Sequence, residues 1–382
     1  MSEGERAADD GSRRAHHIVM QLHTSAFITM GDTPWRHLLV RAKYTLMRWQ
    51  GLVYPDAYFI PVWLGARKVD FLALGQKIDV RRYDYIFTEL HAGVGQLQYP
   101  LDLMAIDPGK MVVITGPPEV FQAYASEEAR RLAHRLLRGA GKVWAYSPET
   151  AAFANRLAEA AVARVIPWSF DYAATRRLGE KGSGKPPKIR VLLGVPLRFQ
   201  GIAPNDPHFL EDCVAEALSL MNGADRQRFQ FFGMVYTRED ELAWRRLGFG
   251  KQFGAVLAPK RFYIRFLRFL GSCDAVLTLP RFTVLGRIAF LAAALGKPGI
   301  FTSNVELHRR LYPGSLVTHS SDENLRGLVR ELLLGLAGRG SLARFLPDNA
   351  AARKIGDFYT NAAWLRETLV SGDSVPPQGF SL

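Results

Sequence analysis

The chain has 382 residues, of which 48% are hydrophobic and 22% are charged, with 34 glycines and 21 prolines. This length suits two domains of roughly 150 residues each, and the apolar share excludes a disordered, collagen-like or coiled-coil chain. Lys and Arg number 49 against 36 Asp and Glu, a net charge of +13, and residues 242–305 hold ten basic residues against one acid, Asp274. We therefore expect an anionic partner to meet the second half of the chain.

The longest weakly polar stretch, 284–301, is interrupted by Arg287 and Lys297. It lacks the roughly 18 uncharged apolar residues of a membrane-spanning helix, so we expect no such helix. The first fourteen residues mix acids and bases without an apolar core. They predict a disordered tail over 1–15 and no export signal.

The two cysteines, Cys213 and Cys273, make neither a disulfide framework nor a metal-ligand spacing. This usage favours a reducing cytoplasm. The sequence contains no HxH, HExxH or CxxC spacing of the kind that metal sites use. We therefore expect neither a metal site nor a bound cofactor.

From residue 16, short β-rich runs alternate with helical runs, a pattern typical of parallel sheets covered by helices. In the first half the expected strands are 17–23, 58–64, 83–90, 110–116, 142–147 and 163–168. Expected helices include 118–137 and 148–159, the second capped by Ser147. Periodicity is then lost over 178–188, where Gly, Lys and Pro gather, and we interpret this stretch as an interdomain linker.

The alternation restarts at residue 189. The expected strands are 189–195, 229–236, 254–258, 274–280, 298–303 and 315–320, with helices at 208–222, 239–247, 261–271, 285–295, 304–311 and 322–337. A helical segment at 349–370 precedes a Gly- and Pro-rich end. The sequence thus predicts an α/β chain with a tail (1–15), an N-terminal Rossmann-like domain (16–177), a linker (178–188), a C-terminal Rossmann-like domain (189–346) and a C-terminal helix and tail (347–382).

One run of the second half combines several recurrent features. A basic helix leads to Asp274, the next strand ends in Pro280, Gly286 follows, and the segment LAAALGKPGIFTSN completes the run. This order resembles the donor half of a GT-B glycosyltransferase, specifically the large retaining group whose motif is two glutamates separated by seven residues. The resemblance implies two Rossmann-like domains facing across a cleft, with the nucleotide sugar bound by the C-terminal domain and the acceptor by the N-terminal domain.

The resemblance also implies how the diphosphate of the donor is bound. Gly286, near a helix start, lets backbone N–H groups approach a phosphate, and the positive end of the helix dipole adds to this attraction. Arginine side chains supply the bidentate, charge-assisted contacts that a diphosphate needs. The donor-binding candidates are Lys260, Arg198, Arg281, Thr283, Gly286 and Arg287.

Thr283 and Leu291 stand where the family has its two glutamates. In the family the first glutamate faces the sugar and the second holds the nucleotide ribose, and leucine cannot accept a hydrogen bond from ribose. This departure leaves three alternatives: a different donor mode, an unusual donor, or a GT-B-like scaffold without activity. It also leaves open whether the reaction retains or inverts the anomeric configuration.

The strand YDYIFTEL, followed by His91, resembles the family's strand that ends in a histidine near the acceptor. Glu89 and His91 lie where this strand meets a loop. An imidazole whose pKa lies near neutrality can position an acceptor hydroxyl or relay its proton, so both residues are catalytic candidates. A purely structural histidine is the competing interpretation.

These features together predict a sugar transferase that uses a nucleotide-diphosphate donor and a saccharide or lipid-linked saccharide acceptor. The basic amphipathic helix 261–271 suits attachment to the anionic inner face of a membrane. Two alternatives stay open. One is a nucleic-acid-modifying glycosyltransferase that binds DNA through its basic C-terminal half, and the other is the inactive scaffold.

Overall fold

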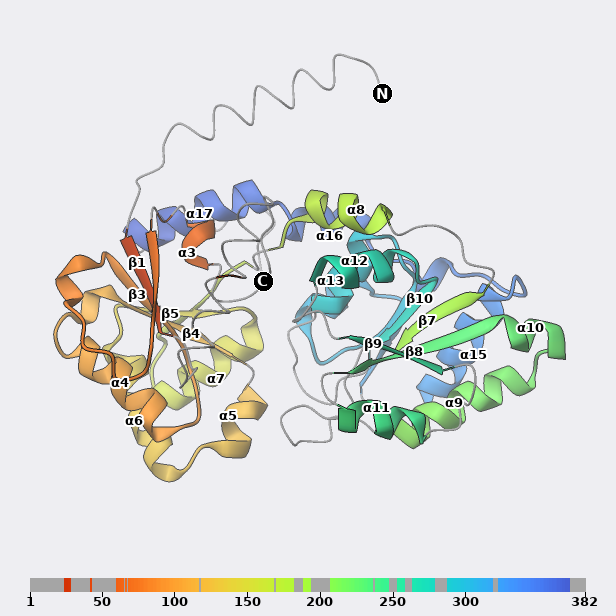
Figure 1. Cartoon of the computed structure of the whole chain (residues 1–382), viewed down its shortest axis with the longest axis horizontal. Coiled ribbons are helices and arrows are strands. Elements are labelled where there is room, and N and C mark those ends of the chain that lie inside the picture. Colours follow the sequence, from red (N-terminus) through yellow and green to blue (C-terminus); the bar gives the residue numbers. More distant parts are fainter. Residues whose placement is uncertain are drawn as a thin grey trace, which may run out of the picture. The chain divides into compact units, whose positions relative to one another are not determined.

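The structure is a computed structural model that describes residues 24–28, 42, 60–64, 66, 68–116, 118–167, 170–181, 188–193, 207–235, 238–246, 253–257, 263–278, 287–318 and 322–371. The chain divides into two compact units (Figure 1). Unit 1 comprises Met1–Phe170 and Asp357–Leu382, and unit 2 comprises Asp171–Gly356. The chain thus enters unit 2 before the expected linker 178–188, and its last helix belongs to unit 1.

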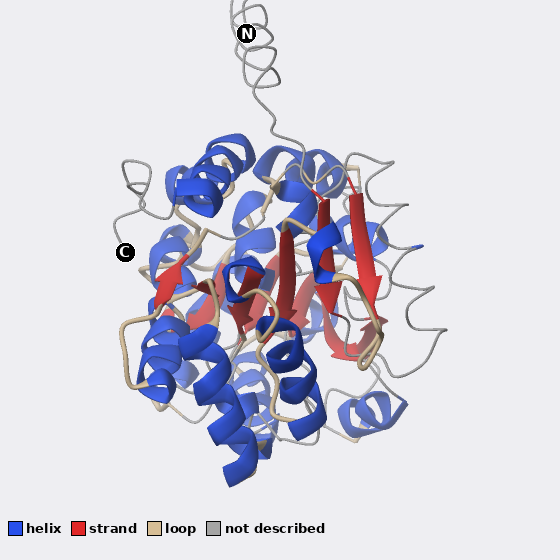
Figure 2. Ribbon diagram, turned by 90° about the vertical axis from the view of Figure 1, so that its left-hand side faces the viewer, coloured by secondary structure: helices blue, strands red, loops and turns tan. Residues whose placement is uncertain are grey.

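Unit 1 contains a six-stranded sheet in the order β2-β1-β3-β4-β5-β6. Every adjacent pair is parallel, and Figure 2 shows strands side by side and enclosed by helices. The strands are β1 (Thr24–Ile28), β2 (Lys68–Leu72), β3 (Tyr85–Glu89), β4 (Met111–Thr115), β5 (Lys142–Ala145) and β6 (Ala163–Val165). The central strands are continuous apolar runs, as expected for a sheet covered on both faces.

The helices of unit 1 are held by local capping as well as by packing. The Ser147 hydroxyl accepts a hydrogen bond from the Thr150 amide at 3.2 Å, which confirms the predicted cap. The described helices of unit 1 are α3 (Ile60–Trp63), α4 (Val94–Met104), α5 (Pro118–Tyr124), α6 (Glu127–Gly139), α7 (Pro148–Ala158) and α17 (Phe358–Ser371), with 3₁₀ turns at Val80–Arg82 and Pro108–Lys110.

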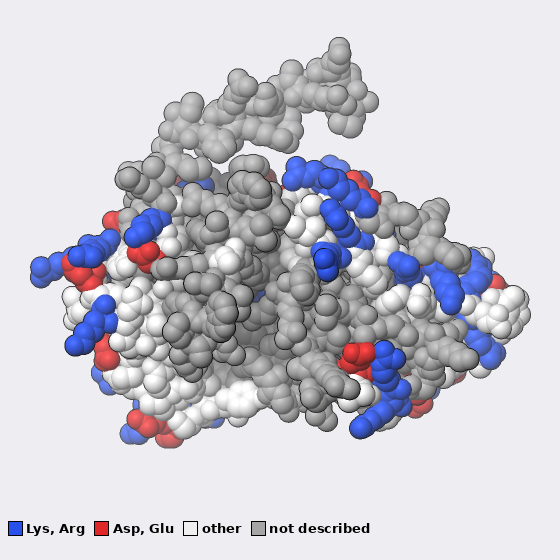
Figure 3. Space-filling model, viewed as in Figure 1, with Lys and Arg blue, Asp and Glu red and all other residues white. Residues whose placement is uncertain are grey.

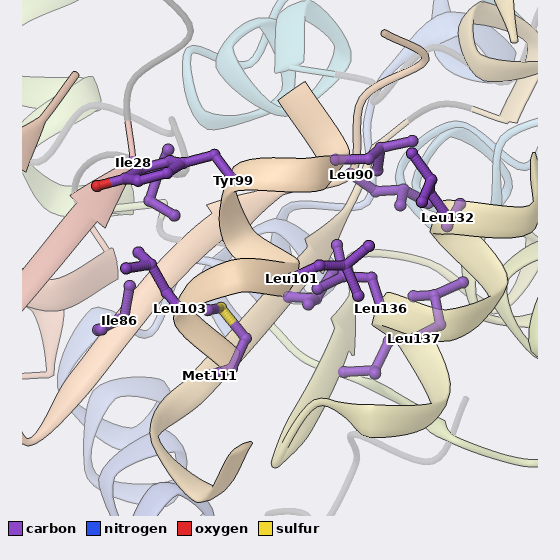
Figure 4. Packing of buried hydrophobic residues seen from close by; sticks show 14 of the residues in the cluster. Ile28, Ile86, Leu90, Tyr99, Leu101, Leu103, Met111, Leu132, Leu136 and Leu137 are labelled. Carbon is purple, nitrogen blue, oxygen red and sulfur yellow. The ribbon is translucent and has the colours of Figure 1, made fainter. Parts of the chain in front are cut away.

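Apolar side chains cover both faces of the unit 1 sheet. On one face, residues of α4 and α6 such as Leu101 and Leu136 pack with strand residues such as Ile86 (Figure 4). On the other face, Trp144 lies 6.0 Å from Phe87, ring centre to ring centre, in a buried aromatic cluster. Each fully buried aromatic side chain contributes about 1.5–3 kcal/mol or more of transfer free energy.

Helix α17 closes the aromatic face of unit 1. The Tyr85 hydroxyl donates to the Leu369 carbonyl at 3.4 Å, and the Arg164 guanidinium lies 6.0 Å from the ring centre of the buried Trp364. Tyr85 belongs to β3 and Arg164 to β6. The last helix of the chain therefore completes the core of the first unit.

Three expectations for unit 1 were wrong. Residues 60–63, expected in a strand, form α3, because Pro61 fits the first turn of a helix, and the strand lies further on, in β2. Residues 24–28, expected in a loop after a strand at 17–23, form β1, and 17–23 lies outside the described residues. The expected helix 118–137 is two helices, since Ser126 caps α6.

Unit 2 contains a second six-stranded sheet, in the order β12-β11-β10-β7-β8-β9. Its adjacent pairs are all parallel. The strands are β7 (Ile189–Leu193), β8 (Phe229–Val235), β9 (Phe253–Leu257), β10 (Ala275–Thr278), β11 (Gly299–Thr302) and β12 (Leu316–Val317). Each of these strands lies within a strand that the sequence predicts, except that β9 begins one residue before the predicted strand 254–258.

Helices cover the unit 2 sheet on both faces. One core joins the sheet to α9 and α15 and includes Leu193, Leu277 and Ile300, and Figure 1 shows α12 and α13 on the other side. The described helices of unit 2 are α8 (Tyr172–Glu180), α9 (Pro207–Ser219), α10 (Gly223–Arg228), α11 (Arg238–Arg245), α12 (Tyr263–Gly271), α13 (Arg287–Ala294), α14 (Glu306–Leu311), α15 (Asn324–Leu336) and α16 (Asn349–Ile355), with a 3₁₀ turn at Ala343–Phe345.

Helices α8 and α12 cross where two glycines meet. A Cβ atom placed on Gly271 would lie 2.0 Å from the Gly179 carbonyl oxygen, so the contact requires a residue without a side chain. The Lys297 ammonium donates to the Gly271 carbonyl at 2.6 Å and thereby satisfies the end of α12. Part of the expected linker, up to Glu180, is thus a packed helix of unit 2.

The predicted basic amphipathic helix is present as α12, and its apolar side is core. Tyr263, Phe266 and Leu267 are buried, whereas Arg265 and Arg268 are exposed. Packing therefore accounts for the buried aromatic residues of this helix. Its exposed side chains are Arg265 and Arg268, and Ile264 and Phe269 are partly exposed.

Candidate functional site

The strand order of unit 1 creates a switch point between β1 and β3. β1 pairs with β2 on one side and with β3 on the other, so the connections that follow these strands diverge. Open α/β sheets bind ligands beyond the carboxyl ends of the strands at such a point. In unit 1 these ends are Ile28 and Glu89. The predicted catalytic residues lie at this position.

Glu89 and His91 form a close pair in unit 1. His91 Nε2 lies 3.7 Å from Glu89 Oε2, and each side chain is 30% exposed. The Nε2 atom itself is shielded from solvent and has no hydrogen-bond partner among the described residues. A carboxylate at this distance complements the charge that the ring gains with a proton. A histidine beside a carboxylate is a residue combination that general acid–base catalysis uses, which keeps the two residues as candidates.

Helix α4 begins directly after this pair. Gly93 is its N-cap and provides no side chain to the first N–H groups. A Cβ on Gly95 would meet nothing within 4 Å, whereas a Cβ on Gly93 would lie 2.7 Å from Gln96 Oε1, so the open space lies at Gly95. Such N–H groups attract anions and other hydrogen-bond acceptors. Sequence reasoning missed this turn, although the run HAGVGQ after a strand is a signal for it.

Unit 2 has its own switch point, between β7 and β10. β7 pairs with β8 on one side and with β10 on the other, and β8 and β9 extend the sheet outward. The carboxyl ends here are Leu193 and Thr278. The order is that of the dinucleotide-binding Rossmann sheet, in which the ligand lies beyond these two strands.

Most of the predicted donor-binding residues follow these strands in the chain and lie outside the described residues. Arg198 comes after β7, and Lys260 comes after β9. Arg281, Thr283 and Gly286 come after β10. The role of these residues in donor binding therefore stays a prediction. Arg287 is the one donor-binding candidate within the described part of the chain.

Arg287 is the first residue of α13, and its side chain is partly exposed. Its guanidinium thus belongs to the helix turn whose N–H groups favour an anion. Leu291 lies one turn further along and is 1% exposed. The position that the sequence resemblance predicts for the second glutamate is therefore a core position in this chain.

Thr278 is a polar residue at the unit 2 switch point that sequence reasoning missed. It ends β10, is 7% exposed, and its hydroxyl has no hydrogen-bond partner among the described residues. It interrupts the apolar strand run DAVLTLP, and that interruption is the signal that could have found it.

Both cysteines are buried and unpaired. Burial raises the pKa of the Cys213 thiol to about 11 and that of Cys273 to about 12. Both thiols therefore stay protonated at neutral pH and are poor nucleophiles.

Within the described ranges, no group of three or more His, Cys, Asp or Glu side chains could hold a metal ion. No described helix has the length and apolar character needed to cross a membrane.

Comparison with known proteins identifies the fold. No family model matches the sequence, and no curated protein matches it. Among solved structures, the chain is similar to HepE of Anabaena in complex with UDP and glucose, with 16% identity, a TM-score of 0.59, and coverage of 91% of this chain and 100% of that chain.

Two further structures agree with this result. Sucrose-phosphate synthase from Thermosynechococcus elongatus is 16% identical with a TM-score of 0.59, over 92% of this chain and 100% of that chain. WaaG, a glycosyltransferase involved in lipopolysaccharide biosynthesis, is 13% identical with a TM-score of 0.53, over 91% of this chain and 100% of that chain. The chain therefore has the GT-B fold, with two Rossmann-like α/β domains and a helical C-terminal region.

Proposed function

We propose that the chain is a glycosyltransferase that moves a sugar from a nucleotide-diphosphate donor to a saccharide or lipid-linked saccharide. The observation that carries the proposal is the GT-B fold, shared over nine-tenths of the chain with a structure that holds UDP and glucose. Fold alone does not specify chemistry. The residues at the two switch points support the proposal further, because each unit places groups of a different kind there.

Unit 2 would bind the donor. Arg287 and the N-terminus of α13 offer positive charge and N–H groups beside the β7–β10 switch point. A diphosphate leaving group gains one negative charge as its bond to the sugar breaks, and charge-assisted hydrogen bonds stabilise that charge. Arg198, Arg281, Thr283, Gly286 and Lys260 are the further candidates for the same role.

Unit 1 would bind the acceptor beside Glu89 and His91. In the reaction, the acceptor oxygen forms a bond to the anomeric carbon, and the bond from that carbon to the diphosphate oxygen breaks. The His91 imidazole takes the proton of the acceptor hydroxyl, with the Glu89 carboxylate next to it. The nucleoside diphosphate then leaves.

The first test is binding of UDP, GDP, ADP and dTDP by calorimetry, with CMP as the control. We expect one diphosphate to bind with micromolar affinity, which would identify the donor class. Absence of binding by all four would refute the nucleotide-sugar proposal. Turnover assays with sugars of the preferred nucleotide would follow, using saccharide and lipid-linked acceptors in separate arms.

Exposed basic residues support an anionic surface as a partner. Figure 3 shows Lys and Arg side chains gathered over the part of unit 2 that α8 and α12 occupy in Figure 1. On these helices the exposed cations are Arg176, Arg177, Arg265 and Arg268, and Lys181 follows α8 directly. Vesicles with 30% anionic lipid should sediment the protein at low salt, and neutral vesicles should not. Tighter binding to duplex DNA than to such vesicles would favour the nucleic-acid alternative.

The buried Leu291 favours a second candidate, a scaffold without transferase activity. At this position the resembling family has a carboxylate that binds the nucleotide ribose, whereas this chain has a buried leucine, which cannot accept a hydrogen bond. If the chain is an inactive scaffold, the wild-type protein neither transfers sugar from any nucleotide sugar nor hydrolyses it. If the chain is a glycosyltransferase, the wild type transfers sugar at a measurable rate, and substitution of Arg287 by alanine lowers that rate.

A further inference from the structure

Thr278 carries a hydroxyl that the described part of the chain leaves without a hydrogen-bond partner. Its oxygen is shielded from solvent and has no hydrogen-bond partner among the described residues. Other threonines are buried to a similar degree, and their hydroxyls are bonded: Thr115 donates to the Trp144 carbonyl, and Thr302 donates to the Thr318 carbonyl. A buried hydroxyl without a partner costs free energy, and folded proteins keep few of them. The Thr278 hydroxyl therefore calls for a partner beyond the described residues.

The position of Thr278 in the sheet indicates where that partner would lie. β10 is a central strand, and its Leu277 aligns with Leu193 of the adjacent strand β7. Thr278 is the next residue, at the carboxyl end of β10 and hence at the switch point of unit 2. Ligands of parallel α/β sheets lie beyond this end of the strands.

The alternation of side chains gives the face on which the hydroxyl lies. Ala275 and Leu277 belong to the core that joins the sheet to α9 and α15. Successive residues of a strand point to opposite faces, so Val276 and Thr278 point to the other face. No residue of α13 belongs to the α9–α15 core, and Figure 1 shows α13 on the other side of the sheet.

The same face and edge hold positive groups. α13 begins with Arg287 there, and its first turn presents N–H groups and the positive end of the helix dipole. The sequence contains no acidic residue between Asp274 and Glu306. A hydroxyl donor, a guanidinium and a helix N-terminus suit an anion that accepts several hydrogen bonds, as a phosphate does.

We propose that Thr278 is a ligand-binding residue of unit 2, whose hydroxyl donates a hydrogen bond to a phosphate oxygen of the bound nucleoside diphosphate. The inference rests on the proposed function and adds to it a contact that the family resemblance does not supply. It also explains why a threonine ends an otherwise apolar strand. The bound phosphate provides the partner that the described residues do not supply.

The test compares three variants of the full-length chain. Thr278→Val replaces the hydroxyl by a methyl group of similar size, and Thr278→Ser keeps the hydroxyl. Thr302→Val is the matched control at the end of the neighbouring strand β11, because its hydroxyl donates to the Thr318 carbonyl and accepts from the Asn304 amide. Each protein is titrated with UDP and with uridine, and its thermal midpoint is measured without ligand.

We expect Thr278→Val to weaken UDP binding about tenfold or more, the usual effect of losing a hydrogen bond to a charged group. Its uridine affinity and its thermal midpoint should stay at or above those of the wild type, since no internal bond is lost. Thr278→Ser should bind UDP like the wild type. Thr302→Val should show the opposite pattern, a lower midpoint with unchanged UDP affinity.

The outcomes separate this inference from the proposed function. If the wild type binds UDP and Thr278→Val binds it equally well, the inference is wrong and the proposed function stands. If the thermal midpoint falls as far in Thr278→Val as in Thr302→Val, the Thr278 hydroxyl has a structural partner within the protein. That result also overturns the inference. If the wild type binds none of the four diphosphates, both are overturned.

Discussion

The two units share an architecture but place their switch points differently. Among the described strands, the unit 1 sheet reverses after two strands, between β1 and β3, whereas the unit 2 sheet reverses after three, between β7 and β10. The chemistry at these points differs as well. Unit 1 presents the carboxylate and imidazole of Glu89 and His91, and unit 2 presents the hydroxyl of Thr278 and the guanidinium of Arg287. Proton exchange thus suits the first unit, and anion binding suits the second.

The largest effect should come from the imidazole of unit 1. We predict that His91→Ala lowers sugar transfer about 10²- to 10⁴-fold, because the acceptor loses its general base, while the Kd of UDP stays unchanged. His134→Ala, on α6, is the matched control and should leave transfer intact. Initial rates and calorimetry measure the two quantities separately. A His91 variant that loses UDP affinity as well would contradict the division of roles between the units.

The guanidinium of unit 2 should show the reverse behaviour. We predict that Arg287→Ala weakens UDP binding about 10- to 100-fold, through loss of a charge-assisted hydrogen bond. Arg268→Ala, on the exposed side of α12, removes the same charge and should change the Kd less than about twofold. Equal losses in both variants would show that only the overall charge matters.

Close backbone contacts allow each unit to be weakened separately. Gly271→Ala places a Cβ 2.0 Å from the Gly179 carbonyl in unit 2, and Gly141→Ala places one 2.6 Å from the Gly109 carbonyl in unit 1. We predict a loss of about 1–3 kcal/mol of unfolding free energy for each. Hydrogen exchange should report faster opening in the substituted unit alone.

Gly327→Ala is the matched control for these glycine variants. Gly327 lies in α15, and a Cβ there would meet nothing within 4 Å. Alanine should therefore raise stability by about 0.5–1 kcal/mol through helix propensity alone. If Gly327→Ala were destabilised as well, the losses in Gly271→Ala and Gly141→Ala could not be attributed to their close backbone contacts.

Acid should weaken unit 2 through a buried histidine. Burial lowers the pKa of His308 to about 3, its Nδ1 lies 3.1 Å from the Thr302 carbonyl, and its Nε2 has no hydrogen-bond partner in the described part of the chain. The unfolded chain takes up a proton near pH 6.5, whereas the folded chain resists it until about pH 3. Stability from this group is therefore present above pH 6.5 and falls by about 1.4 kcal/mol per pH unit below it.

Denaturant unfolding at pH 7.5, 6.5, 5.5 and 4.5 measures this effect. His308→Asn keeps an N–H group near the Thr302 carbonyl and removes the titration, so its stability should depend less on pH over this range. Hydrogen exchange should assign the difference to unit 2. An equally steep profile in the variant would show that other groups cause the acid sensitivity.

The sequence predicted most strands of both sheets, because each of these is an apolar run bounded by turn residues, but it missed β1, a central strand of unit 1. It failed for β2, whose run KVDFL is interrupted by Asp70, and for α3, where apolar residues around Pro61 resemble a strand. Periodicity measures how apolar a segment is on each face. It cannot show that a proline-containing apolar run will form a single helical turn.

The candidate site likewise contains residues that local sequence patterns can predict and a residue that depends on the fold of the whole unit. Glu89 and His91 could be predicted because they follow a recognisable strand, and their pairing needs no more than local geometry. The run DAVLTLP marks Thr278 as a polar residue in an apolar strand, but its proposed role depends on its having no partner among the described residues and on β10 lying next to β7. Strand order is a property of the whole unit and is not encoded in any one segment.

The return of α17 to unit 1 has a consequence for the order in which the protein is made. Domains generally fold as units as they leave the ribosome, the N-terminal one first. Here the residues up to Phe170 lack the helix that carries Trp364 and Leu369 until all of unit 2 and then α17 have been synthesised. Unit 2, which is continuous in sequence, can fold as soon as its last residue emerges. The unit that is begun first is therefore the unit that is finished last.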